Sequence, residues 1–196
     1  MAMDLRQRRR LQTARDIQLA AVTLALEHGL DCTTTDAIAK EAAVSTRTFF
    51  NYYPNKEAAI LGEAMKIDVA GADWFINSKA PLVEDLGLLL GRLYQVAPVE
   101  RGLLTKILEV VQKNPALRDM FHVRGKATAD VLADILTARL GPDSLIEARL
   151  LSDLAVRALT EAILIWARDT EMRLDDLSAM VTENLRRVAA VMDRAD

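Results

Sequence analysis

The chain has few of the features that mark secreted, membrane-spanning or cysteine-rich metal-binding proteins. Its single cysteine, Cys32, allows no internal disulfide and no zinc site built from several cysteines. The longest unbroken apolar run covers residues 162–167, far short of the roughly 20 residues that a membrane-spanning helix needs. No apolar signal-peptide core follows the N-terminus, where arginines stand instead. We therefore expect a soluble, cytoplasmic protein.

Strand signals are almost as scarce as cysteine. No Asn-Gly or Asp-Gly pair is present to form a tight hairpin, and valine, isoleucine and threonine are scattered among helix formers. Helical periodicity recurs instead, and it stops where glycine or proline interrupts it. The pattern predicts an all-α protein of about nine helices, over residues 4–28, 35–42, 46–53, 55–77, 82–96, 100–113, 115–140, 144–169 and 175–194.

Charge is distributed unevenly along the chain. Residues 1–15 contain five arginines against one aspartate, a net charge of +4, whereas residues 58–196 contain 17 basic against 21 acidic residues, a net charge of −4. A basic end on an acidic protein indicates that this end meets a polyanion, although a solvated, frayed tail would show the same composition.

Residues 35–53 read TDAIAKEAAVSTRTFFNYY and predict two short helices joined by a tight turn. Ser45 can cap the second helix, because its hydroxyl can accept a backbone N–H at the helix start. Phe49 and Tyr53 are four residues apart and can pack inward together. The opposite face carries polar and aromatic residues, which favours a DNA-binding helix-turn-helix over a hairpin that serves only as core.

Two stretches, DCTTTDAIA at residues 31–39 and VSTRTFFNYYPNKE at residues 44–57, resemble the TetR family of bacterial transcriptional regulators. The resemblance covers about residues 10–60, and the rest of the chain matches only in helix count and order. It implies a three-helix DNA-binding domain over residues 1–56 and a helical ligand-binding and dimerisation domain over residues 57–196. One departure is Ala43, where the family usually has glycine in the turn; an alanine at positive φ costs on the order of 1 kcal/mol.

The resemblance also assigns roles in DNA binding. Hydroxyls at helix starts favour phosphate, Tyr52 keeps a hydroxyl for phosphate, and Lys56 looks like the family's backbone-anchoring lysine. Arg47 is the best candidate to read a base, since a guanidinium can pair with O6 and N7 of guanine, and the Phe50 ring can contact a thymine methyl. The basic N-terminal arm can follow the backbone or enter a narrow minor groove. The predicted DNA contacts are Arg9, Arg10, Thr35, Ser45, Thr46, Arg47, Thr48, Phe50, Asn51, Tyr52 and Lys56.

Apolar stripes on the last two helices support the dimerisation that the resemblance implies. A symmetric dimer is also what a palindromic operator requires, although a monomer core would give the same stripes. The predicted interface residues are Leu151, Leu154, Ala158, Ala162, Ile165, Val181, Leu185 and Val188.

A small-molecule pocket in the middle helices is implied in the same way. Its candidate lining residues are Tyr94, Phe121, His122 and Trp166, each of which could equally be a core residue. The composition indicates an apolar or amphipathic effector. Its identity, the operator, and whether the chain represses or activates stay open.

Enzyme functions find little support in the sequence. The two histidines, His28 and His122, form no His-x-x-x-His pattern, and no phosphate-binding glycine loop is present. We predict no catalytic residue, no metal site and no cofactor. The alternative function is a helical small-molecule-binding or enzymatic bundle with a vestigial DNA-binding hairpin.

Overall fold

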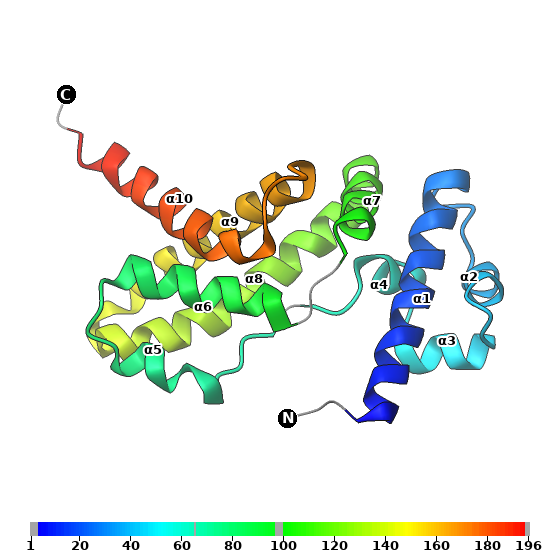
Figure 1. The fold of residues 1–196 in the computed structure, drawn as a ribbon, viewed down its shortest axis with the longest axis horizontal. Helices are drawn as coiled ribbons and strands as arrows, with labels where there is room; N and C mark the ends of the chain where they lie inside the picture. Colours follow the sequence, from blue (N-terminus) through cyan, green and yellow to red (C-terminus); the bar gives the residue numbers. More distant parts are fainter. Residues whose placement is uncertain (1–3, 65, 97–99, 195–196) are drawn as a thin grey trace. The chain divides into compact units, whose positions relative to one another are not determined.

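The computed structural model describes residues 4–64, 66–96 and 100–194, and these residues form helices without any strand (Figure 1). This result confirms the all-α prediction. The α-helices are α1 (Leu5–His28), α2 (Thr35–Glu41), α3 (Thr46–Tyr52), α4 (Lys56–Leu61), α5 (Asp73–Asn77), α6 (Leu82–Val96), α7 (Arg101–Lys113), α8 (Pro115–Leu140), α9 (Leu145–Arg168) and α10 (Leu177–Met192). Three 3-10 helices are η1 (Ala70–Ala72), η2 (Pro142–Ser144) and η3 (Leu174–Asp176).

The chain divides into two compact units, Met1–Ala64 with Val99–Phe121, and Met65–Pro98 with His122–Asp196. In the first unit α1 packs against α2, α4 and α7. The core of this unit combines small residues of α1 with larger side chains from the other helices, among them Ile17, Ala20, Ala21, Ile38, Phe49, Ile60, Ile107, Val110 and Leu117. The first compact unit thus contains α7 and the start of α8 in addition to the first four helices. The predicted functional division between residues 56 and 57 stays a prediction.

One predicted helix is wrong. Residues 55–77 do not form a single helix, because α4 ends at Leu61 and Gly62 adopts a left-handed φ of 70°. The carbonyl of Ile60, which a continuing helix would pair with residue 64, instead accepts a hydrogen bond from Gln18 Nε2 at 3.1 Å. A Cβ on Gly62 would lie 2.3 Å from that same nitrogen. The other eight helices lie within two residues of their predicted limits.

In the second unit, α6 crosses α10 at a pair of glycines. Gly87 and Gly91 are four residues apart on α6 and face Ser178 and Thr182 of α10. A Cβ at Gly87 would lie 1.9 Å from Thr182 Oγ1 and 2.7 Å from the Ser178 carbonyl oxygen. The two helix backbones can approach this closely only because both positions lack a side chain.

A buried ion pair connects α8 to α6 in the same unit. Arg139, near the end of α8, lies 2.8 Å from Asp85 Oδ2 of α6, and the two side chains are only 8% and 6% exposed. The guanidinium also donates to the carbonyls of Phe75 (3.1 Å) and Ala80 (2.8 Å) and lies over the Phe75 ring. A single side chain therefore holds α5, the start of α6 and the end of α8 together.

We predict that Gly87→Ala lowers the free energy of unfolding by about 1–3 kcal/mol, because the added methyl group must push α10 away from α6. Gly125→Ala, in the middle of α8, is the matched control. Its Cβ would meet only Val156 Cγ1 at 3.9 Å, so that variant should gain about 0.5–1 kcal/mol from the better helix propensity. Urea denaturation of both variants measures the difference, and equal stabilities would contradict the close crossing.

Candidate nucleic-acid interface

Side-chain caps define the start of α2 and of α3. The Ser45 hydroxyl accepts the backbone N–H of Thr48 at 3.0 Å, which confirms the predicted cap of α3. Thr34 caps α2 in the same way by accepting the N–H of Ala37 at 3.2 Å. Both caps satisfy N–H groups that have no partner inside their helix.

The turn between α2 and α3 keeps a left-handed residue. Ala43 has a φ of 54°, and it is the only non-glycine residue at positive φ in the described ranges. Its N–H donates to the Lys40 carbonyl at 3.1 Å, and the N–H of Val44 donates to the Ala39 carbonyl at 2.9 Å. The turn therefore has the conformation that glycine would adopt without strain, at a cost of about 1 kcal/mol for alanine.

Helix α3 has one face in the core and one face in solvent. Phe49 is fully buried and Tyr53, just beyond the helix, is 5% exposed, as the four-residue spacing predicts. The Tyr53 hydroxyl donates to the Ala14 carbonyl of α1 at 3.2 Å, which holds the end of α3 against α1. Arg47 and Asn51 are exposed on the outer face, and Phe50 is 53% exposed.

Several hydroxyls predicted to contact DNA already have partners inside the helix-turn-helix. Thr46 Oγ1 donates to Asp36 Oδ1 of α2 at 2.7 Å. The hydroxyls of Ser45 and Thr48 share a hydrogen bond of 2.8 Å. These bonds fix α3 to α2 and set the first turn of α3. As a result, the uncommitted donors on the outer face of α3 belong mainly to Arg47 and Asn51. Thr35, the first residue of α2, is half-buried and stays a predicted phosphate contact.

Lys56 has a structural role that the sequence did not reveal. Its ammonium donates to the carbonyls of Leu30 (2.6 Å) and Thr33 (3.0 Å), which belong to the connection between α1 and α2. An ammonium has three hydrogens, so one is left for a phosphate. The predicted phosphate contact of Lys56 therefore rests on this third hydrogen.

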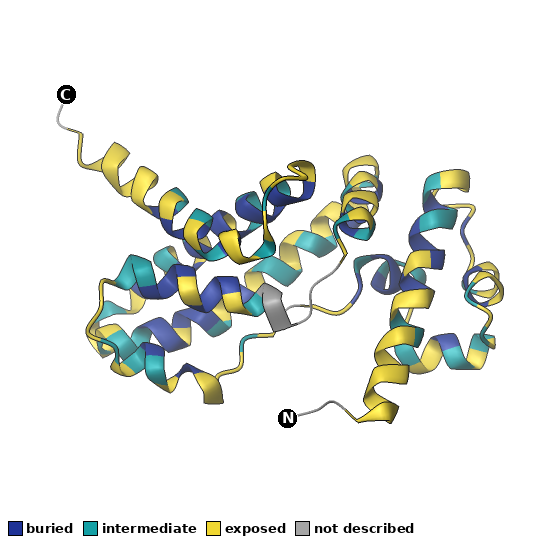
Figure 2. Cartoon of the chain, viewed as in Figure 1, coloured by how far each residue is buried: buried dark blue, intermediate teal, exposed yellow. Residues whose placement is uncertain are grey.

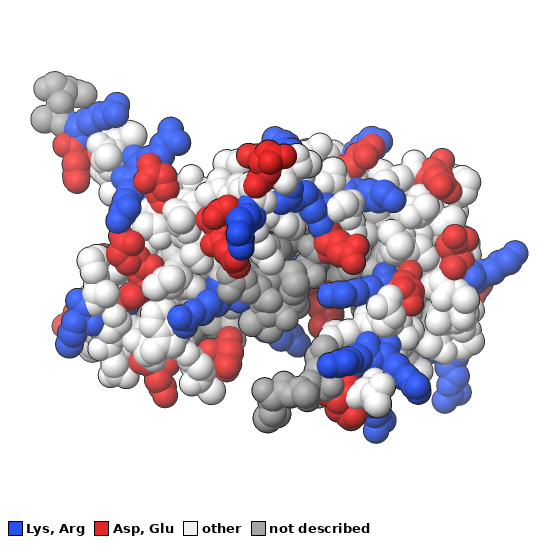
Figure 3. All heavy atoms as spheres, in the orientation of Figure 1, with Lys and Arg blue, Asp and Glu red and all other residues white. Residues whose placement is uncertain are grey.

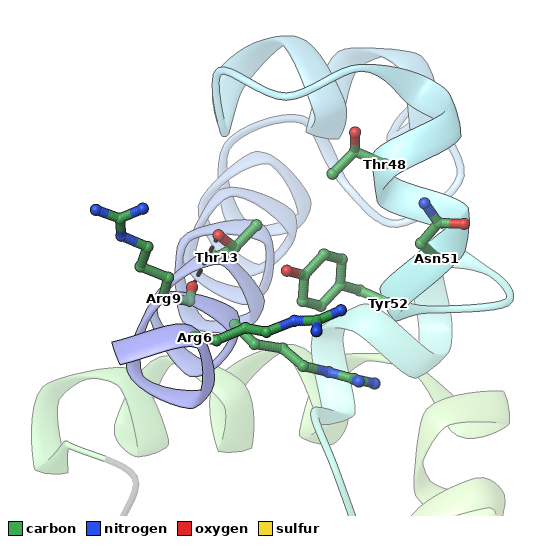
Figure 4. A pocket seen from close by; sticks show the side chains of 7 residues that line it. Arg6, Arg9, Thr13, Thr48, Asn51 and Tyr52 are labelled. Carbon is green, nitrogen blue, oxygen red and sulfur yellow. Dashed lines mark hydrogen bonds between the residues drawn. The ribbon is translucent and has the colours of Figure 1, made fainter. Parts of the chain in front are cut away.

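The basic N-terminal segment is helical. From Leu5 onward it is the beginning of α1, so Arg9 and Arg10 project from a helix and not from an extended arm. Figure 3 shows basic side chains gathered over the first turns of α1. Together with α3 these turns enclose a concavity of about 440 Å³, lined by Arg6, Arg9, Arg10, Thr13, Thr48, Asn51 and Tyr52 (Figure 4).

Comparison with known proteins identifies this arrangement. The family described as "Bacterial regulatory proteins, tetR family" matches residues 17–61, which run from the buried part of α1 to the end of α4. The fatty acid metabolism regulator protein of Bacillus subtilis is 26% identical over 174 residues, covering 85% of this chain and 90% of that protein. The HTH-type transcriptional regulator TcmR of Streptomyces glaucescens is 29% identical over 147 residues, covering 71% of this chain and 65% of TcmR.

Solved structures agree with these relatives. FadR of Thermus thermophilus, a TetR-family transcriptional repressor in complex with lauroyl-CoA, is 26% identical, with coverage of 93% and 96% and a TM-score of 0.53. FadR of Bacillus halodurans shares the fold at 22% identity, with coverage of 93% and 97% and a TM-score of 0.57. Residues 17–61 thus match the TetR family, and the chain is similar over most of its length to a repressor of that family. The chain is a DNA-binding transcriptional regulator.

The predicted dimer residues fall into two groups. Ala158, Ala162, Val181 and Leu185 are buried inside the protomer, and Leu151 and Leu154 are half-buried. Ile165 and Val188 are 44% and 38% exposed. Figure 2 shows that the second half of α10 is exposed. Further exposed apolar residues on α9 and α10, outside the predicted set, are Ile146, Leu150 and Val191.

The four predicted pocket residues are divided between the two units. Trp166 is buried in the second unit, whereas Phe121 is half-buried against the core of the first. His122 is exposed, and the side chain of Tyr94 lies outside the described residues. The ligand site therefore stays a prediction. In the described ranges no three His, Cys, Asp or Glu residues cluster as metal ligands would, and no helix is long and apolar enough to cross a membrane.

Proposed function

We propose that this TetR-family regulator is a repressor that binds a palindromic operator as a homodimer, reads bases with the outer face of α3, and is released by an amphipathic effector. The observation that carries the DNA-reading part is the uncommitted, exposed pair of Arg47 and Asn51 on a helix whose other side is fixed by Phe49 and Tyr53. A rigid helix with free donors on its outer face fits the major groove.

Each exposed residue of α3 matches a different base-edge chemistry. A guanidinium such as that of Arg47 can donate two hydrogen bonds to O6 and N7 of guanine, and an amide such as that of Asn51 can pair with N6 and N7 of adenine. Phe50 offers no hydroxyl, but its exposed ring can contact a thymine methyl. Arg47 and Asn51 are four residues apart, so they share one face of α3 and can read neighbouring base pairs.

Exposed apolar residues on two packed helices support the dimer. Helices α9 and α10 pack against each other, and Ile146, Leu150, Ile165, Val188 and Val191 are large apolar residues left exposed on them. A soluble monomer rarely exposes so many large apolar side chains on adjacent helices without a partner to cover them. We take a second copy of the chain as that partner, since two half-sites of a palindrome need two recognition helices.

Two relatives support an acyl-CoA as the effector. The Thermus thermophilus repressor is bound to lauroyl-CoA, and the Bacillus subtilis relative is a fatty acid metabolism regulator. An acyl-CoA joins an apolar chain to a charged head and fits the amphipathic effector expected from the sequence. It releases DNA only if it binds the DNA-incompetent state more tightly than the competent one.

Replacing Arg47 by Ala should cost about 1–3 kcal/mol of operator affinity and flatten the preference at one base pair in each half-site, because the lost guanidinium reads that base pair. The operator can be selected from random duplexes with the wild-type protein. Titration on the operator, on its single-base variants and on a scrambled duplex measures the change.

Lys56→Gln is the control for the Arg47 variant, because the ammonium of Lys56 is held by two carbonyls and does not belong to the base-reading face. It should lower affinity for the operator and the scrambled duplex by the same factor. If Arg47→Ala also weakens both duplexes equally, Arg47 contacts phosphate. If the wild-type protein selects no sequence, the chain is not a sequence-specific repressor.

The dimer predicts a specific effect of charge at Ile165. Ile165→Glu should convert the dimer to a folded monomer, because a glutamate there is solvated in the monomer but buried without a partner in the dimer, at a cost of several kcal/mol. Leu88→Glu on α6, whose side chain is also 44% exposed, should leave the dimer intact. Sedimentation at micromolar concentration distinguishes these results, and a monomeric wild-type protein would contradict the proposal.

Lauroyl-CoA should lower operator affinity at least tenfold, which corresponds to a coupling free energy of about 1.4 kcal/mol. Free coenzyme A is the control, since it has the charged head without the apolar chain. Operator titration in the presence of each compound gives the coupling. A compound that binds the protein and leaves operator affinity unchanged is not the effector.

A further inference from the structure

The concavity between α1 and α3 contains positive charge and no negative charge. Its seven lining residues include three of the four arginines in the first turns of α1 and not one carboxylate. Like charges gathered in this way repel one another unless an anion or counterions lie between them. The composition of the wall therefore favours an anionic occupant.

Helix geometry places the arginines on one side of α1. Arg6, Arg9, Arg10 and Thr13 follow the spacing i, i+3, i+4 and i+7, which puts them on a single face, and Arg8 lies on the opposite face. The hydrogen bond from the Tyr53 hydroxyl to the Ala14 carbonyl holds α3 against α1 one residue beyond Thr13. The walls of the concavity thus belong to two helices that are fixed to each other.

The donors of the concavity are uncommitted. In the described part of the chain, the guanidinium groups of Arg6, Arg9 and Arg10 make no hydrogen bond or ion pair, and neither does the Tyr52 hydroxyl. Figure 4 shows the Arg6 side chain extending past the Tyr52 ring toward α3, while Arg9 points the other way. The Thr13 hydroxyl is already used, since it donates to the Arg9 carbonyl at 3.0 Å.

We propose that this concavity is the binding site of one backbone phosphate of the operator, which is held by Arg6, Arg10 and the Tyr52 hydroxyl. We call this phosphate-binding site the seat. The inference rests on the proposed DNA-binding function and adds a contact from α1 to those of the helix-turn-helix. Asn51 belongs both to the wall of the concavity and to the exposed face of α3, so a phosphate in the seat is adjacent to the bases that α3 reads. The seat thereby fixes the register of α3 on the duplex.

Two variants of equal charge and opposite placement test the seat. Arg6→Gln removes a seat arginine, and Arg8→Gln removes an arginine of the same helical turn that does not line the concavity. Glutamine keeps a comparable helix propensity, so neither change should unfold α1. Operator and scrambled-duplex titrations at several salt concentrations should show a reduced slope of log affinity against log salt for Arg6→Gln alone, by about 0.9 for each protomer and so about 1.8 for the bound dimer. Equal reductions for both variants would overturn the proposal.

A second experiment locates the phosphate. Each operator phosphate is replaced in turn by an uncharged methylphosphonate. For the wild-type protein and for Arg8→Gln, one position in each half-site should lower affinity by up to about tenfold, and Arg6→Gln should be insensitive at that same position. Effects of the protein variant and the methylphosphonate that add independently at every position would overturn the seat.

The outcomes also separate the seat from the proposed function. A wild-type protein without sequence preference, together with a salt slope lowered only in Arg6→Gln, refutes the sequence-specific repressor and supports the seat. A clear operator preference with identical slopes for both variants supports the repressor and refutes the seat. Inorganic phosphate that binds to the wild-type protein but not to Arg6→Gln, and that does not compete with the duplex, would identify a site for the free anion and overturn its assignment to DNA.

Discussion

The attachment of α1 to α3 and α4 is the constraint on which the DNA-reading unit depends. Helix α3 has only seven residues, and a helix of that length is not stable alone in water. It is held by its buried residue Phe49 and by the contact of Tyr53 with the Ala14 carbonyl. Three further side-chain hydrogen bonds fix α4 to the same frame, one from Gln18 to the Ile60 carbonyl and two from Lys56 to the α1–α2 connection. Each contributes on the order of 1 kcal/mol or more, and together they set the direction in which Arg47 and Asn51 point.

The sequence predicted helices well wherever local signals determined them. Periodicity and the breakers at Pro54 and Gly141 placed eight helices within two residues of their observed limits. The end of α4 could not be predicted in this way, because it depends on Gln18, which is 42 residues away from Ile60. The close crossing of α6 and α10 was equally hidden. The spacing of Gly87 and Gly91 is visible in the sequence, but the helix that they face is not.

The sequence predicted which side of α3 faces solvent, but it did not predict the hydrogen-bond partners of the hydroxyl groups on that helix. The four-residue spacing of Phe49 and Tyr53 correctly predicted the inner side of α3. It therefore also predicted that Arg47 and Asn51, on the opposite side, are exposed. It could not show that Thr46 is bound to Asp36, because that bond depends on how α2 and α3 meet. The apolar stripes of α9 and α10 predicted interface residues that are in part protomer core, since core and interface follow the same helical period.

The core of the first unit also includes the beginning of α8. Leu117 of α8 is fully buried and shares its core with Ile17 of α1 and Phe49 of α3. Residues of α8 up to Phe121 belong to the first unit, whereas the fully buried Leu132 belongs to the second. The frame that orients the recognition helix therefore depends on the start of α8 as well as on α1, and this contribution lies more than 60 residues beyond α3 in the chain, where no local sequence signal links the two.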